Sequence, residues 1–373
     1  MRLSEVSFQV CLILLILVFA ELYTQAARSS DGSEQSVKIG LLIADKKSVA
    51  AIHGAKLAIM RANDEGGFNG HPFQLVVRST EGPWGTGSRE AVNLIFEDKV
   101  WALLGSHGGR DAHLVEQVAT KATVVFVSAW ASDPTLSQAF VPWFFNCVPN
   151  DLQQADALID EIFERRKLNK VAVVSGNDYD SKQALNTFLK EIKLKEKTDP
   201  VQLIYENFSQ DLNGLLDQIN VADAECIILF CRTSASLKII RQIRQRKMDQ
   251  PVFGSLFLLN ENELSDFELQ NLDDIQLVSS EKWSDPRSLS FSKEYNEIFG
   301  KHPGMVAAYA FDGMNLIIES IKRAGSSERE KIQKELSGIN YEGITGPIEF
   351  DDKGNRSGPY HLVRTKNGFP VLF

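Results

Sequence analysis

The sequence predicts an α/β protein with two lobes, each built around a parallel sheet. Short apolar strands alternate with amphipathic helices from Val37 to Ser128, and the alternation restarts at Lys170. Alternating strands and helices form right-handed βαβ units, in which the strands lie parallel. Two runs of this alternation in a chain of 373 residues therefore indicate two lobes.

The first run contains four expected strands and three expected helices. In its first helix, apolar residues recur at helical spacing, and Gly66 and Gly67 end the helix. The other two helices are marked by Val92 to Phe96 and by Leu114 to Val118. We expect the strands at residues 37–43, 73–77, 100–104 and 124–128.

The second run is followed by a tail of helices and strands. Its strands are expected at residues 170–175, 201–205, 226–230 and 252–253, and its helices at 181–194, 211–219 and 234–246. In the tail, helices are expected at 288–300, 304–323 and 328–337, and a final strand pair at 346–350 and 360–363. Because the tail has too few elements for a third domain, we expect it to complete the two lobes.

The composition is that of a globular protein with a sizeable core. Hydrophobic residues make up 43% of the chain and charged residues 24%. The formal net charge of −9 argues against a nucleic-acid partner, because phosphate binding needs a basic surface. The same charge favours a protein that stays monomeric by self-repulsion.

Residues 1–27 have the order of a secretory signal peptide. Arg2 precedes an apolar run from Val10 to Ala20, and the small residues Ala26 and Ala27 follow. The run is shorter than the roughly 20 residues of a membrane span. We therefore expect secretion across the inner membrane into the periplasm, with an uncleaved N-terminal anchor as the alternative.

Three cysteines remain beyond this segment. Cys226 and Cys231 are five residues apart on an apparent strand, so their side chains point to opposite faces. Together with Cys147 they are an odd number, which leaves at least one thiol unpaired in a monomer. We expect Cys226 and Cys231 to be buried apolar residues.

The loops that follow the strands are the places to look for a binding site. In open parallel sheets, ligands bind beyond the carboxyl ends of the strands. The loop Gly105–Asp111 leaves a strand and enters a helix, and Gly108 and Gly109 let the backbone approach a ligand. Free N–H groups at the helix start favour an anion such as a carboxylate. The alternative is that the glycines form a tight turn.

Other loops supply aromatic, hydroxyl and charged side chains. Trp130 and Ser132 follow the fourth strand, where they either contact a ligand or serve as a core residue and a helix cap. Trp84 lies in a glycine-rich loop, either on a ligand or packed on the loop. In the second lobe, Tyr179 can stack and donate a hydrogen bond, and Arg232 is either a ligand cation or a surface residue.

Motifs for catalysis and for metal binding are lacking. The sequence has no nucleophile elbow, P-loop or dinucleotide fingerprint, so we expect neither an enzyme nor a cofactor. His107, Asp111 and His113 match no strong metal-ligand spacing, so no metal is expected there. Asp351–Asn355 lacks the distal glutamate of a calcium loop and is interpreted as a turn between two strands.

Five motifs in order resemble those of one family. They are Asn63–Gly70, Val100–Ser106, Ser128–Leu136, Tyr309–Asp312 and Gly343–Asp351, the last similar to the family's G-x-T-G-x-I-x-F-D segment. Over residues 37–373 the chain resembles the type I periplasmic binding proteins of the leucine/isoleucine/valine-binding kind, which serve ABC transporters for amino acids and related solutes.

The resemblance implies two Rossmann-like lobes joined by three crossovers, which close on a ligand by a hinge motion. Residues 37–148 and 281–351 would form the first lobe, and residues 149–280 and 352–373 the second. It implies that Gly109, Arg110, Ala131 and Ser132 hold the ligand carboxylate and that Tyr179 matches the family's second-lobe tyrosine.

The sequence departs from the family at two of these places. Asp180 follows Tyr179 where the family has glycine, and the acidic residue that binds the ligand amine falls near Leu256. Since a buried ammonium needs a partner, either Asp111 or Asp178 takes over, or the ligand is not an α-amino acid. We favour a carboxylate without a free amine, and an aromatic one would suit Trp84, Trp130 and Phe257.

The expected function is that of a solute-binding protein of an ABC-type uptake system, which delivers an amino acid or related small carboxylate to a membrane permease. The alternative is a sensor that presents its ligand to a receptor or signalling partner. The residues expected to bind the ligand are Trp84, Gly108, Gly109, Arg110, Trp130, Ala131, Ser132, Asp178, Tyr179, Arg232 and Phe257.

Overall fold

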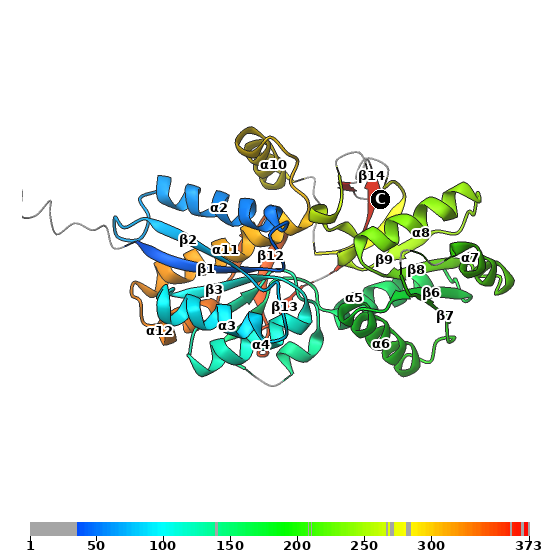
Figure 1. The fold of residues 1–373 in the computed structure, drawn as a ribbon, viewed down its shortest axis with the longest axis horizontal. Coiled ribbons are helices and arrows are strands. Elements are labelled where there is room, and N and C mark those ends of the chain that lie inside the picture. Colours follow the sequence, from blue (N-terminus) through cyan, green and yellow to red (C-terminus); the bar gives the residue numbers. More distant parts are fainter. Residues whose placement is uncertain are drawn as a thin grey trace, which may run out of the picture.

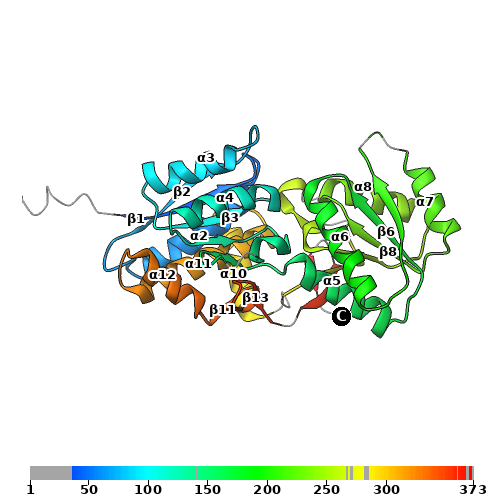
Figure 2. The same cartoon turned by 90° about the horizontal axis from the view of Figure 1, so that it is seen from below.

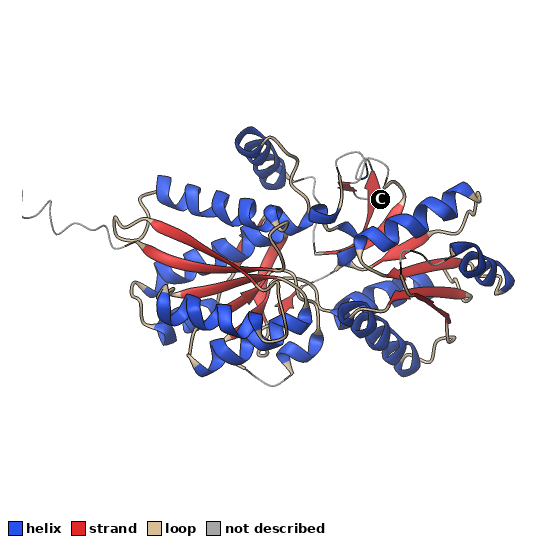
Figure 3. Ribbon diagram, in the orientation of Figure 1, coloured by secondary structure: helices blue, strands red, loops and turns tan. Residues whose placement is uncertain are grey.

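The computed structural model describes residues 36–138, 141–207, 209, 211–265, 268, 272–280, 285–358, 360–366 and 369–371. It has two lobes, each built on its own sheet and covered by helices on both faces (Figures 1 and 3). The view from below shows the same two bodies side by side (Figure 2). The expected signal peptide, residues 1–27, lies outside the described residues.

The first lobe contains a five-stranded parallel sheet in the order β2-β1-β3-β4-β5. Its strands are β1 (Val37–Ile43), β2 (Phe73–Ser79), β3 (Ala102–Ser106), β4 (Phe126–Ser128) and β5 (Phe144–Asn146). Its helices are α2 (Val49–Asp64), α3 (Thr86–Val92), α4 (Gly109–Lys121), α10 (Pro286–Phe299), α11 (Met305–Ala324) and α12 (Arg329–Ser337), with a π-helical turn at Asn93–Glu97 and a 3₁₀ turn at Pro134–Ser137.

Alternate side chains of this sheet enter two cores. Ile39 and Leu41 pack in the cluster that contains α2 and α11, whereas Leu42 and Leu103 pack with α3 and α4. This is the period-two alternation of a strand buried on both faces. Gly54 of α2 fits closely against α11, since a Cβ there would lie 2.1 Å from the Ala307 carbonyl oxygen.

The second lobe contains a seven-stranded sheet in the order β15-β14-β10-β9-β8-β6-β7. Its strands are β6 (Val171–Gly176), β7 (Val201–Tyr205), β8 (Cys226–Phe230), β9 (Val252–Gly254), β10 (Ile275–Ser279), β14 (His361–Lys366) and β15 (Phe369–Val371), and β14 and β15 are antiparallel. Its helices are α5 (Asp151–Ile159), α6 (Tyr179–Leu194), α7 (Leu212–Val221) and α8 (Thr233–Gln245), with a π-helical turn at Asp160–Arg165 and 3₁₀ turns at Leu256–Leu259 and Glu261–Glu263.

A small antiparallel sheet adjoins the first lobe. It consists of β11 (Tyr341–Gly343), β12 (Gly346–Phe350) and β13 (Arg356–Ser357). The expected final strand pair is therefore wrong, because β12 pairs with β11 and β13 while β14 pairs with β10 of the other lobe. Asp351–Asn355 does form a turn between two strands, in which Asp351 accepts hydrogen bonds from the Lys353 and Asn355 N–H groups.

Several elements were not expected from the sequence. The strand β5 has three residues, too few for a periodic pattern to show, and β10 and α5 were also missed. Searched over its described ranges, the structure holds no helix with the length and hydropathy of a membrane span.

The three cysteines are free and buried, as expected for Cys226 and Cys231. Cys226 packs with α5 and α6, and Cys231 packs in the cluster on the opposite face of the sheet. Burial raises the pKa of the Cys147 thiol to about 12, so it stays protonated. Its thiol donates to the Ser128 carbonyl oxygen at 3.1 Å.

Two of the family-like motifs contact each other. Asp312 of α11 is buried, and its carboxylate accepts hydrogen bonds from the Ile344 N–H and from the Thr345 N–H and hydroxyl. A Cβ on Gly343 would lie 2.5 Å from the Asp312 Oδ2. These motifs therefore fix the connection between α11 and β12.

The chain crosses between the lobes three times, after β5, after β10 and after β13. These crossings meet around Thr345. Its carbonyl oxygen accepts hydrogen bonds from the Ser280 hydroxyl and from the buried Arg356 guanidinium, which also donates to the Cys147 and Pro347 carbonyl oxygens. One guanidinium thus joins the segments through which the lobes are connected.

The lobe boundaries expected at 148/149, 280/281 and 351/352 stay a prediction. Pairing of β13 with β12 favours a third crossing a few residues later, after Ser357.

Replacement of Arg356 is expected to destabilise the protein strongly. In Arg356→Met the carbonyl oxygens around the guanidinium lose their donors while they remain buried, at a cost of about 3 kcal/mol or more in the free energy of unfolding. Arg356→Lys keeps the charge but loses the planar fork of donors, so its free energy of unfolding should lie between those of wild type and Arg356→Met. Urea unfolding measures both variants.

Lys293→Met is the matched control, because the Lys293 side chain is 79% exposed. A loss below about 1 kcal/mol in Arg356→Met would contradict this role of the guanidinium.

Candidate functional site

A cavity of about 540 Å³ lies where the two lobes face each other. It is lined by residues that follow the carboxyl ends of β1, β3 and β4 in the first lobe and of β6, β8 and β9 in the second. Because parallel strands end on one edge of their sheet, the loops of six strands converge on one space. The lining residues after these strands include Asp45, Lys47, Ser48, His107, Gly108, Trp130, Asp178, Asp180, Arg232 and Phe257.

The start of α4 faces the second lobe at the edge of this cavity. Gly108 is the N-cap of the helix, and the Gly109 N–H donates a hydrogen bond of 2.8 Å to the Oδ1 of Asp180 in α6. A Cβ on Gly108 would lie 2.2 Å from the Asp180 Oδ2, so only glycine permits this approach. The position that the sequence assigns to a ligand carboxylate is filled by a carboxylate of the protein.

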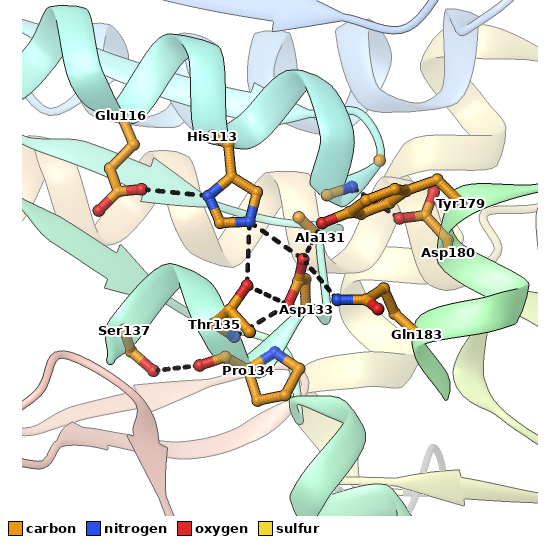
Figure 4. Close-up of polar contacts among 12 residues, drawn as sticks. His113, Glu116, Ala131, Asp133, Pro134, Thr135, Ser137, Tyr179, Asp180 and Gln183 are labelled. Carbon is orange, nitrogen blue, oxygen red and sulfur yellow. Dashed lines mark hydrogen bonds and ion pairs between the residues drawn. The ribbon is translucent and has the colours of Figure 1, made fainter. Parts of the chain in front are cut away.

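Tyr179 also reaches the first lobe. Its hydroxyl donates a hydrogen bond of 2.7 Å to the Oδ2 of Asp133, which the Gln183 amide approaches at 3.5 Å (Figure 4). Tyr179 and Gln183 belong to α6, and Asp133 caps the 3₁₀ turn after β4. Tyr179 therefore joins the lobes directly, and it is absent from the lining of the cavity.

Asp133 is the centre of a buried polar cluster. Burial opposes its ionisation, but hydrogen bonds from His113, Thr135 and Tyr179 outweigh that effect and hold its pKa well below the usual range. The same contact with Asp133 raises the pKa of His113. Burial raises the pKa of Glu116, which lies 3.7 Å from the His113 ring, to about 7. Figure 4 shows these side chains converging from α4, from the turn after β4 and, for Tyr179, from α6.

Two aromatic rings line the cavity from opposite lobes. Trp130 and Phe257 meet edge to face, with ring centroids 5.2 Å apart. Trp130 is mostly buried. Both residues were expected at the site, and the structure brings them together there.

Asp178 and Arg232 line the second-lobe side of the cavity. Asp178 caps α6 by accepting hydrogen bonds from the Ser181 N–H and hydroxyl. The Arg232 Nε lies 3.8 Å from the Asp178 Oδ1, and its side chain is 67% exposed. This cation therefore lies at the rim, partly balanced by Asp178.

Two further interlobe contacts lie at the starts of α2 and α11, beside the cavity. The Asn262 Oδ1 accepts a hydrogen bond from the Ala50 N–H at the start of α2. The Glu261 carboxylate accepts from the Gly304, Val306 and Ala307 N–H groups at the start of α11. The lobes are thus in direct contact at two places around the cavity.

Six of the expected residues lie outside the cavity lining: Gly109 and Tyr179, whose interlobe contacts are described above, and Trp84, Arg110, Ala131 and Ser132. Trp84 is 66% exposed, and the Arg110 guanidinium lies over its ring at 4.5 Å, which is a surface cation–π pair. Ala131 is fully buried, and the buried Ser132 donates to the Asp151 Oδ1 at 2.5 Å. Trp84 therefore lies at the surface in contact with Arg110 of α4.

The loop after β1 was missed by sequence reasoning. Asp45, Lys47 and Ser48 line the cavity, as do Asn260 and Glu263. The rule that ligands bind beyond strand ends also applies to β1 and would have found the first three. Asn260 and Glu263 lie some residues beyond β9, where no local pattern indicates a site.

The residues weighed as metal ligands lie in separate contacts. Asp111 accepts from the Thr80 hydroxyl, and His113 contacts Asp133. His107 stacks on Phe126. Among the residues that the structure describes, no three His, Cys, Asp or Glu side chains gather as they would around a metal ion.

Comparison with known proteins assigns the family. The model of the family described as "Periplasmic binding protein" matches residues 36–369. The chain belongs to this family. It is a type I periplasmic binding protein of the leucine/isoleucine/valine-binding kind, as its motifs predict, and the family is one of binding proteins and not of enzymes. Membership also implies a location outside the cytoplasm.

Two curated relatives show the range of proteins that this periplasmic binding protein resembles. Glutamate receptor 3.4 of Arabidopsis thaliana is 22% identical over 89% of the chain, which spans only 39% of that receptor. The leucine-, isoleucine-, valine-, threonine-, and alanine-binding protein of Pseudomonas aeruginosa is 20% identical, with 81% of each chain covered.

Solved structures share the fold of this periplasmic binding protein. The branched-chain amino acid transporter substrate binding protein LivJ of Streptococcus pneumoniae, in complex with isoleucine, superposes with a TM-score of 0.79 at 21% identity, covering 90% of this chain and 98% of LivJ. A solute binding protein of an ABC transporter from R. palustris, in complex with benzoate, gives 0.78 at 18% identity, covering 90% and 95%.

The Asp133 cluster is expected to make stability depend on pH. Asp133→Asn should lower the free energy of unfolding by about 2 kcal/mol near pH 5 to 6. The stabilisation that ionised Asp133 contributes to the folded state is present above its unfolded pKa of about 3.9, and it is lost as the pH falls below that value. The His113 contribution is present below about 6.5 and is lost as the pH rises through its raised folded pKa.

The difference between wild type and Asp133→Asn should therefore shrink toward pH 3 and, to a smaller extent, toward pH 9. Urea titrations across this range measure it. Asp217→Asn is the control, because the Asp217 side chain is 65% exposed and pairs on the surface with Arg246. If the difference in unfolding free energy between wild type and Asp133→Asn did not vary with pH, Asp133 would not be the ionised centre of this cluster.

Proposed function

We propose that the chain is the periplasmic solute-binding protein of an ABC-type uptake system. It binds an amino acid or a related small solute in the cavity between the lobes, closes by a hinge motion, and presents the solute to a membrane permease as a monomer. The observation that carries this proposal is the convergence of six strand ends on one cavity with a polar, charged and aromatic lining.

The candidate binding residues are those that line this cavity among the ones expected from the sequence: Gly108, Trp130, Asp178, Arg232 and Phe257. We propose positioning roles for Gly109 and Tyr179, whose contacts join the lobes. The sequence favoured a ligand carboxylate at the start of α4. Since the Asp180 carboxylate lies there, the proposal assigns no residue to a ligand carboxylate.

The hinge supports closure around a solute. The crossings converge near Thr345, so rotation of one lobe needs changes in few backbone segments. A solute that contacts both lobes stabilises the closed form by as much as its affinity for that form exceeds its affinity for the open form.

A sensing role is the second candidate. The likeness to a plant glutamate receptor over most of this chain, which is less than half of that receptor, favours it. In such a protein the closed lobes would be recognised by a receptor or signalling partner instead of a permease.

The test starts from the solute that the protein retains. The chain is purified without denaturation, its small molecules are identified by mass spectrometry, and X-ray scattering is recorded with and without the solute. A solute that raises the melting temperature and lowers the radius of gyration supports the proposal. Solute-dependent stimulation of a permease ATPase in proteoliposomes then supports uptake, whereas binding without stimulation favours sensing.

Trp130→Ala is expected to weaken binding of that solute at least about tenfold, because the ring forms one wall of the cavity. Titration calorimetry measures the affinity, and circular dichroism checks the fold. Trp84→Ala removes the same side chain from an exposed loop and should leave the affinity unchanged. Equal losses in both variants would place the solute elsewhere.

A further inference from the structure

We propose that the cavity recognises its solute through a positively charged nitrogen and not through a carboxylate, with Asp180 as the main contact. This inference rests on the proposed function and names the class of solute.

The first step is that the anion-binding position of the cleft is occupied by the protein. The start of a helix attracts negative charge. Here the Asp180 Oδ1 accepts the Gly109 N–H, and the second oxygen lies against Gly108. Within the described residues no hydrogen bond reaches that second oxygen, and Asp180 lines the cavity. A solute carboxylate placed here would meet a like charge.

The second step is the balance of charge around the cavity. Its lining contains four carboxylates, on Asp45, Asp178, Asp180 and Glu263, and two cationic side chains. Both cationic side chains, Lys47 and Arg232, belong to exposed residues at the rim. Asp180 is less exposed, and burial raises its pKa to about 6. A cationic solute would relieve this penalty, and an anion would add to it.

The third step concerns His107, a buried ring that lines the same cavity. Burial lowers the pKa of His107, so the ring is neutral. Its Nδ1 lies 3.3 Å from the Gly108 carbonyl oxygen, which can only accept, so Nδ1 carries the proton. Nε2 is then an acceptor, and it has no partner in the described part of the chain. The ring therefore adds no positive charge to the lining, and its Nε2 is buried beside Gly105, where a Cβ would lie 2.9 Å away, out of reach of a solute.

The fourth step is the aromatic wall. Trp130 and Phe257 line the cavity that contains Asp180. The face of an aromatic ring attracts cations, and indole does so most strongly. The carboxylates and the aromatic rings both favour a cation, and neither favours an anion.

Three probes that share a phenylethyl group separate the effect of the positive charge from that of the negative charge. Phenethylamine carries the cation, 3-phenylpropanoate the carboxylate, and phenylalanine both. Titration calorimetry of the full chain, freed of retained solute, is expected to give phenethylamine an affinity at least about tenfold higher than that of 3-phenylpropanoate.

Two variants of Asp180 sharpen the test. Asp180→Asn keeps an acceptor for the Gly109 N–H but loses the charge, and should weaken phenethylamine binding about tenfold. Asp180→Ala also frees the start of α4, and should strengthen 3-phenylpropanoate binding. Asp223→Asn, which removes an exposed carboxylate paired with Lys170, should change neither affinity.

Equal or tighter binding of 3-phenylpropanoate by the wild type would overturn the cation assignment and leave solute binding intact. The retained solute gives a measurement that needs no variant: a cationic molecule without a carboxylate supports the inference, and a purely anionic one overturns it. If the protein retains no solute and none of the three probes binds, the proposed function itself fails.

Discussion

The buried guanidinium of Arg356 holds together the segments through which the two lobes are joined. It donates to the carbonyl oxygens of Cys147, Thr345 and Pro347, and Ser280 meets the same Thr345 carbonyl. A guanidinium can satisfy this arrangement because its donors are fixed in a planar fork. With the crossings fixed, the two sheets keep the carboxyl ends of their strands directed at one space.

Several hydrogen bonds join the two lobes around the cavity. Tyr179 bonds to Asp133, Asp180 to the start of α4, and Asn262 to the start of α2. Each is a hydrogen bond between protein groups of the two lobes, and such bonds are individually worth about 1 kcal/mol. In the proposed closure these protein groups would contribute to the closed form, and the solute would add its own differential affinity for that form.

One of the two departures from the family's motifs, Asp180, changes the charge at the start of α4. Asp180 follows the family-like tyrosine and places a carboxylate where backbone N–H groups would otherwise face the solute. The backbone scaffold is unaffected, because Gly108 and Gly109 leave room for the carboxylate. Under the proposed preference for a cation, a change of one side chain would alter the charge preferred by the site while the fold stays the same.

Prediction from sequence succeeded where the pattern is local. The strands β1, β7, β8 and β12 were expected at the bounds that the structure shows, because apolar runs and period-two burial are properties of neighbouring residues. Trp130 and Phe257 were expected together at the site, and they meet there. The short β5 and the pairing of β12 with β13 were missed, because strand pairing depends on contacts that local periodicity does not encode.

By itself, the sequence determined the two α/β lobes, the family and the loops in which a binding site had to be sought. It did so because strand and helix periods and the strand-end rule need only the order of residues along the chain. The tertiary structure decided which loop residues face the cavity and which do not. Gly109 and Asp180 are 71 residues apart, and only the packing of α6 against α4 brings them together. This packing places the Asp180 carboxylate at the start of α4, where the sequence predicted a ligand carboxylate.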